Sequence, residues 1–400
     1  MIRKLAQLLK ERGPLAMLST LADRLQAERK YHELFDVLLM KQRLLLGLPV
    51  ALNTPIDELP EPARTHLEAG YLAVCREIGS QLLTEGRVGE AWPYLRPLGD
   101  RPFVAAGLAK IEPTEDNLPA LIEILLHEGI DVGRGYQLVL DHYGTCNAIT
   151  AFESVILAKR HTDQQDAAAR LVKRLHEELL ANLTADIEHR EGQPPRETNL
   201  HAMLAARPHW CDGGAYHIDV SHLAATLRHA RLLEEPQAIA LALDLAEYST
   251  RISPELRGRG EEPFVVADAE VRFFAAQLGE NVSEALDYFR ARAEQVDAYR
   301  EGTLAAEVYV VLLARVGRPS EAVEAAARLI PPGTHTTGFA PPLMELSAQA
   351  GDYTRLLEVC EASDNVVGYA AALLAGLHQE NEVGVTQKRA KRNRPAAGEK

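Results

Sequence analysis

Apolar residues recur along almost the whole chain at steps of three and four positions. Residues 67–83 and 162–188 show this well. Such spacing places apolar side chains on one face of a helix, whereas a half-buried strand needs alternating apolar and polar positions. Sustained alternation is hard to find, and residues 215–220 are the one short candidate. The pattern therefore predicts an all-α protein. The apolar positions are Leu67, Tyr71, Val74, Ile78, Leu82 and Leu83 in the first stretch, and Leu171, Leu175, Leu179, Leu180 and Leu183 in the second.

Several pairs of predicted helices share one layout around a glycine. A small residue allows two helices to approach closely, and a glycine adopts turn conformations that other residues resist. We therefore expect each pair to fold as a helical hairpin. The turn glycines are Gly86, Gly279, Gly317 and Gly351, and alanines follow the first three of them at Ala91, Ala285 and Ala322.

This layout resembles the tetratricopeptide-like family of helical-hairpin repeats, which has a glycine at the turn and an alanine in the second helix. The resemblance implies an α-solenoid of stacked antiparallel helical hairpins, with units near residues 70–110, 265–295, 300–332 and 340–376. The aromatic residue of the family's first helix is missing and the spacing drifts, so a regular array of units of about 34 residues is not expected.

Three segments interrupt the helical pattern. Residues 188–199 and 208–219 contain proline, glycine and polar residues, and residues 331–342 are a third connector rich in proline. The first two segments predict an N-terminal helical lobe over residues 1–190, a linker over 191–219 and a C-terminal tetratricopeptide-like lobe over 220–380. Residues 381–400 hold too few apolar side chains for a core, so we expect a disordered basic tail.

The net charge of this tail differs in sign from that of the rest of the protein. The net charge is −14, but the last fifteen residues hold six Lys or Arg and one Glu, which leaves −19 on residues 1–385. An acidic body repels the phosphates of nucleic acid and anionic lipid, so we expect neither as its partner. No apolar run is long enough for a membrane span, and the N-terminal residues are typical of an amphipathic helix rather than a secretory signal.

The four cysteines are widely separated and form no C-x-x-C pair. A disulfide scaffold is not expected in a protein of 400 residues, so a reducing compartment, the cytoplasm, is the expected location.

The most unusual stretch is residues 209–222, where metal-binding residue types are concentrated. Imidazole, thiolate and carboxylate groups are the ligands of zinc and of non-haem iron, which makes either metal a candidate cofactor. The alternative is structural: Asp219 caps a helix over residues 220–233, Gly213 and Gly214 form a turn, and the histidines make ordinary hydrogen bonds. The candidate metal ligands are His209, Cys211, His217, Asp219 and His222.

A second unusual stretch, residues 141–150, is predicted to lie between helices over 132–140 and 148–159. The thiolate of Cys146 would be favoured near a helix N-terminus, and His142 could act as its base, which makes them candidate catalytic residues. The alternative is that Gly144 ends one helix, Thr145 or Asn147 caps the next, and Cys146 is simply buried. The 141–150 and 209–222 segments could also meet in one polar pocket.

Three functions remain open on these observations. A protein- or peptide-binding helical-repeat scaffold requires no catalytic residue, and helical solenoids usually bind peptides or proteins. The alternative is a metal-dependent (zinc or iron) or Cys/His-dependent enzyme with a pocket formed by the 141–150 and 209–222 segments. The third possible function is that of a structural subunit, which would pair with another copy through the apolar residues 44–50.

Overall fold

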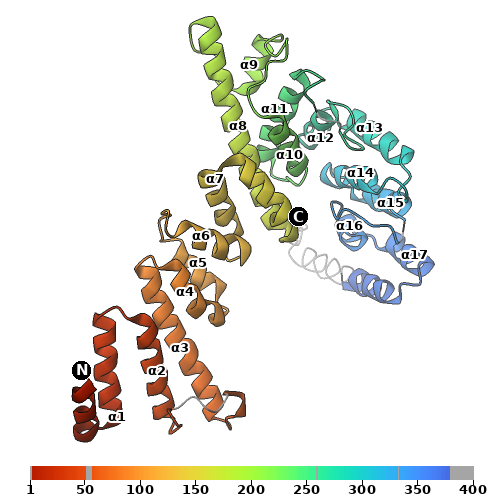
Figure 1. The fold of residues 1–400 in the computed structure, drawn as a ribbon. Helices are drawn as coiled ribbons and strands as arrows, with labels where there is room; N and C mark the ends of the chain where they lie inside the picture. Colours follow the sequence, from red (N-terminus) through yellow and green to blue (C-terminus); the bar gives the residue numbers. More distant parts are fainter. Residues whose placement is uncertain (1, 51–55, 258–259, 332, 379–400) are drawn as a thin grey trace, which may run out of the picture. The chain divides into compact units, whose positions relative to one another are not determined.

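The computed structural model describes residues 2–50, 56–257, 260–331 and 333–378 (Figure 1). Within these ranges the protein is helical and contains no strand, which confirms the all-α prediction. Residues 215–219 lie in an irregular segment, so the short alternating stretch forms no strand in this structure. No helix of the described ranges has the length and apolar character needed to cross a membrane.

The protein divides into two compact units, Met1–Lys159 and Arg160–Lys400. In the first unit each of the helices α2, α3 and α4 packs against the helix before it, and α6, a π-helical turn and α7 form a second packed group. Its elements are α1 (Ile2–Ala27), α2 (Tyr31–Leu45), η1 (Ile56–Glu58), α3 (Ala63–Thr84), α4 (Val88–Leu95), η2 (Arg96–Leu98), α5 (Arg101–Leu108), α6 (Leu118–Ile122), the π-helix η3 (Glu123–His127), α7 (Val132–Ser154) and η4 (Ile156–Ala158).

The predicted apolar face of α3 forms part of the core of this unit. Leu67, Val74, Ile78, Leu82 and Leu83 are all buried, as the spacing predicts. Close approach depends on small residues. A Cβ atom at Gly79 would lie 2.5 Å from Leu95 Cδ2, and one at Gly135 would lie 2.6 Å from the backbone nitrogen of Leu126.

In the second unit the long helix α8 packs against α10 and α11, and from α11 to α17 each helix packs against the helix before it. Figure 1 shows α13 to α17 following one another in this order. The elements are α8 (His161–Glu191), α9 (Leu200–Ala206), α10 (Val220–Ala230), α11 (Pro236–Arg251), α12 (Ala269–Gln277), α13 (Val282–Gln295), α14 (Leu304–Arg315), α15 (Pro319–Leu329), α16 (Leu343–Ala350) and α17 (Thr354–Ala362), and a further helix covers 366–378.

The boundary between the units lies about thirty residues before the one predicted from the sequence. The reason is α8, whose apolar residues Leu171, Leu175, Leu179 and Leu183 are buried and which packs against helices that follow it. The predicted linker over 191–219 contains the short helix α9. The predicted tail over 381–400 lies outside the described residues.

The turns between consecutive helices repeat one geometry. Each of the four predicted turn glycines has a positive φ, from 70° to 89°, and lies between two helices. The residue after each glycine donates its backbone N–H to the carbonyl five positions earlier, a helix-ending motif that a left-handed residue makes possible. These N···O distances are 3.0 Å for Arg87 to Leu82, 2.9 Å for Glu280 to Ala275, 2.9 Å for Arg318 to Leu313 and 3.2 Å for Asp352 to Ser347.

Two more turns have this geometry without a glycine, and the sequence pattern therefore missed them. Arg29 has φ 56° and Asp364 has φ 52°, and the residues after them donate to the carbonyls of Leu25 and Cys360 at 3.0 Å and 2.9 Å. A left-handed conformation is costly for a residue with a Cβ.

We therefore expect Arg29→Gly to raise the free energy of unfolding of the first unit by about 0.5–1 kcal/mol, because glycine relieves the left-handed strain. Gly86→Ala should lower it by about 1 kcal/mol for the opposite reason. Urea unfolding followed by the fluorescence of Trp92, in a Trp210→Phe background, measures the first unit alone. A lower midpoint for Arg29→Gly would contradict the strain argument.

Close helix packing makes a second prediction. Gly135→Ala should destabilise the first unit by about 1–3 kcal/mol, because its new methyl group would collide with the backbone of Leu126. Gly89→Ala is the matched control in α4: its Cβ would meet Ala120 Cβ at an ordinary 3.7 Å. It should stabilise the unit by about 0.5–1 kcal/mol through helix propensity. Equal effects of the two substitutions on the Trp92 unfolding curve would refute a close approach at Gly135.

Candidate functional site

His217 lies at the centre of a buried hydrogen-bond network. Its side chain is 5% exposed, and its ring nitrogens lie 3.0 Å from Asp186 Oδ2 and 3.0 Å from the Tyr248 hydroxyl. Asp186 also accepts from Trp210 Nε1 at 2.7 Å and from Arg190 Nε at 2.9 Å. Burial raises the pKa of Asp186, but hydrogen bonds from His217 and Trp210 outweigh it and hold the pKa below its ordinary value. Both ring nitrogens of His217 are thus already engaged within the protein.

The other predicted metal ligands have separate roles. Asp219 Oδ1 accepts from the backbone nitrogens of Ser221 at 2.8 Å and His222 at 3.1 Å, which is the helix-capping role given above as the alternative. His209 has a side chain that is 85% exposed and lies 3.1 Å from Asp212. Cys211 is buried, and burial raises the pKa of its thiol, which disfavours the thiolate that a metal binds.

The described residues contain no group of three His, Cys, Asp or Glu side chains placed to hold a metal ion. The sequence singled out His217 as a candidate metal ligand, but its hydrogen-bond partner Asp186, which lies on α8 and 31 positions earlier, was not among the candidates. The predicted zinc or iron site therefore draws no support from the geometry of the 209–222 segment.

The second candidate pair, His142 and Cys146, lies on either side of a break in α7 at Gly144, which ends one helical segment as the structural alternative predicted, although the two segments approach closer to the glycine than the predicted ends at 140 and 148. The helix continues through residue 143, passes Gly144 at φ 80° and ψ 175°, and resumes at Thr145. A hydrogen bond of 3.1 Å from the Tyr136 hydroxyl to the carbonyl of Ala148 joins the two halves. Cys146 is exposed rather than buried.

These two segments belong to different units, residues 141–150 to the first and 209–222 to the second. Their predicted common pocket stays a prediction.

A groove of about 720 Å³ lies within the second unit. It is lined by helices that are far apart in the sequence and by the connector over residues 338–342, part of the proline-rich segment noted in the sequence. The helical lining residues are His161, Thr162 and Gln165 of α8, Ile239 of α11, Gln277 of α12, Val311, Ala314 and Arg315 of α14, and Glu345 and Gln349 of α16, and Glu234 lies just before α11.

The wall formed by the connector is held by one buried carboxylate. Glu307, in the first turn of α14, is fully buried. Its Oε1 accepts from the Thr303 hydroxyl at 2.6 Å and the Thr337 backbone nitrogen at 2.7 Å. Its Oε2 accepts from the Thr337 hydroxyl at 2.9 Å and from the backbone nitrogens of Phe339 at 2.8 Å and Ala340 at 3.1 Å. Five donors therefore compensate the cost of burying this charge.

The floor of the groove contains a buried arginine. Arg315 has a side chain that is 13% exposed, and its Nη1 donates to the carbonyl of Arg231 at 2.8 Å and to Gln277 Oε1 at 3.1 Å. Burial lowers the pKa of Arg315 to about 10, so the guanidinium remains charged at neutral pH. The sequence reasoning missed both Arg315 and Glu307. A signal existed for Glu307, because it is the one charged residue in the apolar run over 304–313.

Comparisons with family models, with curated proteins and with solved structures find no match for this protein.

The network around Glu307 generates a stability prediction. Glu307→Gln should lower the free energy of unfolding of the second unit by about 2 kcal/mol, and Glu307→Ala by about 3 kcal/mol or more, because buried donors lose their acceptor. Burial raises the pKa of Glu307, but its hydrogen bonds hold the net pKa below 4.5. Its stabilising contribution is therefore present above the ordinary carboxyl pKa and is lost as the pH falls through the lowered value.

Urea unfolding followed by Trp210 fluorescence, in a Trp92→Phe background, measures this unit. Between about pH 6 and pH 3 the natural protein should lose more stability than Glu307→Gln, which has no carboxyl group to protonate. Parallel pH profiles for the two proteins would exclude the assigned role of this carboxylate.

Proposed function

We propose that this protein is a protein- or peptide-binding helical scaffold built as a tetratricopeptide-like solenoid. Two features support the proposal. Consecutive helices pack against each other from α1 to α4 and from α10 to α17, and at least six turns of the described residues share one hydrogen-bond geometry. A repeated helix-turn-helix unit of this kind extends a surface along the stack, and its side chains are free to vary without loss of the fold.

The groove of the second unit is the observation on which the proposal rests. Its volume of about 720 Å³ lies in the range of protein ligand sites. Its lining comes from α8, α14, α16 and the connector, so a ligand would contact several hairpins at once. Two of its lining residues, Gln165 and Gln349, have amide groups with both donors and acceptors, as an extended peptide backbone requires, whereas the amide of Gln277 is engaged by Arg315 and by the carbonyl of Phe273.

The charges of the groove indicate the chemistry of the peptide. Arg315 is already engaged by the carbonyl of Arg231 and by Gln277. Glu234 lies 3.8 Å from Arg315 Nη2 and 3.6 Å from His161 Nε2, so Glu345 is the exposed carboxylate of the lining that has no ion-pair partner among the described residues. Phe339 and Pro341 provide apolar surface beside them. A peptide with a lysine or arginine next to an apolar residue would complement this lining.

A display library of random peptides, selected against the full-length protein, tests the proposal. Enriched sequences are then synthesised with a fluorescent label, and their dissociation constants are measured by anisotropy. Glu345→Lys should weaken binding at least about tenfold, because it reverses a charge in the groove. The control is Glu284→Lys, which reverses an exposed glutamate in the first turn of α13, outside the groove.

We expect the enriched peptides to be basic and their affinity to fall as salt is added, because part of the attraction is electrostatic. The failure to enrich any peptide, or equal affinities for the natural protein and Glu345→Lys, would overturn a peptide site in this groove.

A further inference from the structure

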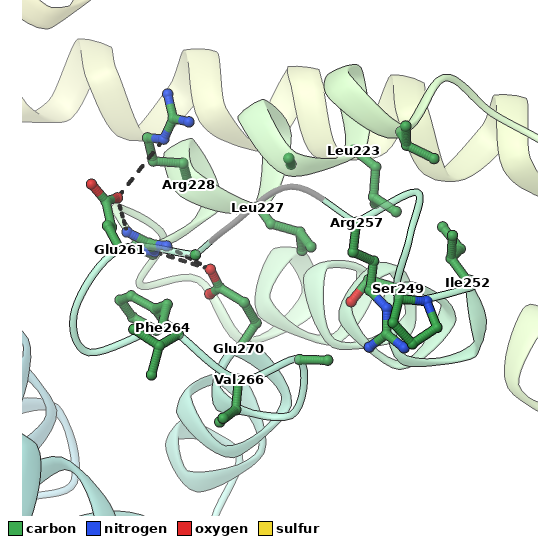
Figure 2. Close-up of a pocket in the computed structure, with 17 residues that line it drawn as sticks. Leu223, Leu227, Arg228, Ser249, Ile252, Arg257, Glu261, Phe264, Val266 and Glu270 are labelled. Carbon is green, nitrogen blue, oxygen red and sulfur yellow. Dashed lines mark hydrogen bonds and ion pairs between the residues drawn. The ribbon is translucent and has the colours of Figure 1, made fainter.

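Apolar side chains gather in two further places of the second unit, outside the groove. One is a cavity of about 530 Å³ formed by α10, the end of α11 and the start of α12, where Leu223, Leu227 and Phe264 are buried (Figure 2). The other is the last described helix, residues 366–378, which follows α17 (Figure 1). Large apolar side chains of this helix are exposed, so it presents a surface that the described residues leave uncovered.

One face of the helix over 366–378 packs on the second unit. Ala372 is fully buried in a cluster with Leu356 and Cys360 of α17, and Tyr369 is partly buried against the same cluster. This inner face holds the helix in place, so the opposite face points away from the unit.

The outer face is apolar along the whole helix. Its five large side chains are between 45% and 77% exposed. At 3.6 residues per turn they lie within an arc of about 120°. A helix that is apolar on both faces is typical of a helix that is buried on both faces, so the outer face is expected to have a partner. The five side chains are those of Val366, Val367, Leu373, Leu374 and Leu377, and the exposed Ala370 lies among them.

The spacing of this face is that of a helix which pairs with another helix. The apolar positions 366, 370, 373 and 377 are separated by steps of four, three and four. This alternation keeps one seam of side chains facing a partner helix, as in coiled coils. The partner of the outer face is therefore itself expected to be helical.

The charge of this helix favours a second copy of the same chain as that partner. Residues 366–377 contain no charged side chain, although 25% of the residues of the protein are charged. Two copies can therefore meet on this face without placing like charges opposite each other, whereas a charged partner helix would find no charge to pair with. Residues 379–400 match the face poorly, because their sequence contains two valines but no leucine, isoleucine, methionine or aromatic residue.

We propose that the protein forms a two-fold symmetric dimer in which the helix over 366–378 pairs antiparallel with the same helix of a second copy. The antiparallel orientation places Leu373 of one copy opposite Ala370 of the other, and Leu377 opposite Val366, so that large side chains meet smaller ones. The dimer surface contains no lining residue of the groove, so the dimer and the peptide site can each fail without the other.

The charge that follows the helix also favours the antiparallel orientation. Five Lys or Arg residues lie within 388–394, shortly after the end of the helix in the sequence. A parallel pair would bring the C-terminal ends of both helices together and increase the repulsion between these like charges. An antiparallel pair keeps the two ends a helix length of about 20 Å apart.

Sedimentation velocity of the full-length protein, between about 1 µM and about 200 µM, tests the dimer. The mass should rise with concentration from the 44.0 kDa of one copy toward twice that value. We expect a dissociation constant on the order of 10 µM, because a single pair of helices is a small interface.

A charge placed on the outer face should remove the dimer. Leu374→Glu should keep the protein at the mass of one copy over the whole range, because the two-fold symmetry places two buried carboxylates in the interface. Leu374 is 69% exposed in a single copy, so this variant should stay folded, which circular dichroism establishes. The matched control is Leu45→Glu, at a leucine of α2 that is 58% exposed, and it should leave the dimer unchanged. This control also tests residues 44–50 as the alternative pairing surface.

Cysteine cross-linking tests the orientation, in a Cys146→Ala background that removes the exposed natural thiol. A mixture of the Val366→Cys and Leu377→Cys proteins should form a disulfide-linked dimer on oxidation, because the antiparallel pair brings these two positions together. Either variant alone should stay largely unlinked.

A mass of 44.0 kDa for the natural protein at every concentration would overturn the proposal. Equal dissociation constants for the natural protein and folded Leu374→Glu would also overturn it, as would loss of the dimer in Leu45→Glu. Efficient linking of Val366→Cys alone, or no linking in the mixture, would exclude the antiparallel pair.

Discussion

Arg231 connects elements of the second unit that are separated by up to 84 positions in the sequence. Its side chain, which is 9% exposed, bonds to Glu261 and to Glu270 of α12 and stacks on Phe264. Its backbone carbonyl accepts from Arg315 of α14. A buried charge is tolerated only where its partners compensate the loss of hydration, so these groups have to be placed together. Arg231 also holds the arginine that lines the groove, so the shape of the groove depends on it.

Glu307 has the corresponding role for the connector that follows α15. A proline-rich segment has few backbone donors for helix hydrogen bonds, and its remaining N–H groups still need acceptors. Glu307 accepts from three of them and from two hydroxyls, and so it gives an irregular segment one defined conformation. In both cases a single buried charge orders a segment that has no regular structure of its own. The connector over residues 338–342 forms a wall of the proposed peptide groove.

The regular part of the fold has a different physical origin. Several helices end in the same way, with a left-handed residue followed by a hydrogen bond back across the last turn. Small residues such as Gly79 and Gly135 then let helices pack at short distance. These constraints are local, since each involves residues within one hairpin or between neighbouring helices. A stack of such hairpins needs no long-range contact to extend itself.

The sequence by itself determined the features that depend on neighbouring positions. The helical period of residues 67–83 predicted the buried face of α3, and Gly86, Gly279, Gly317 and Gly351 predicted four helix–helix turns, because period and left-handed conformation are local properties. Arg29 and Asp364 show the limit of predicting turns from glycine positions, because these two residues make the same left-handed turn without being glycines.

Only the tertiary structure decided the sites. His217 was noticed because it lies among other metal-binding residue types, yet its actual partners, Asp186 and Tyr248, come from other helices about thirty positions away on either side. Arg231 and Glu270 look like ordinary surface charges in the sequence, and their importance arises from burial and from pairing with each other. The burial of a side chain and its pairing with a charged partner depend on contacts between residues far apart in the sequence, so a local pattern of residues does not predict them.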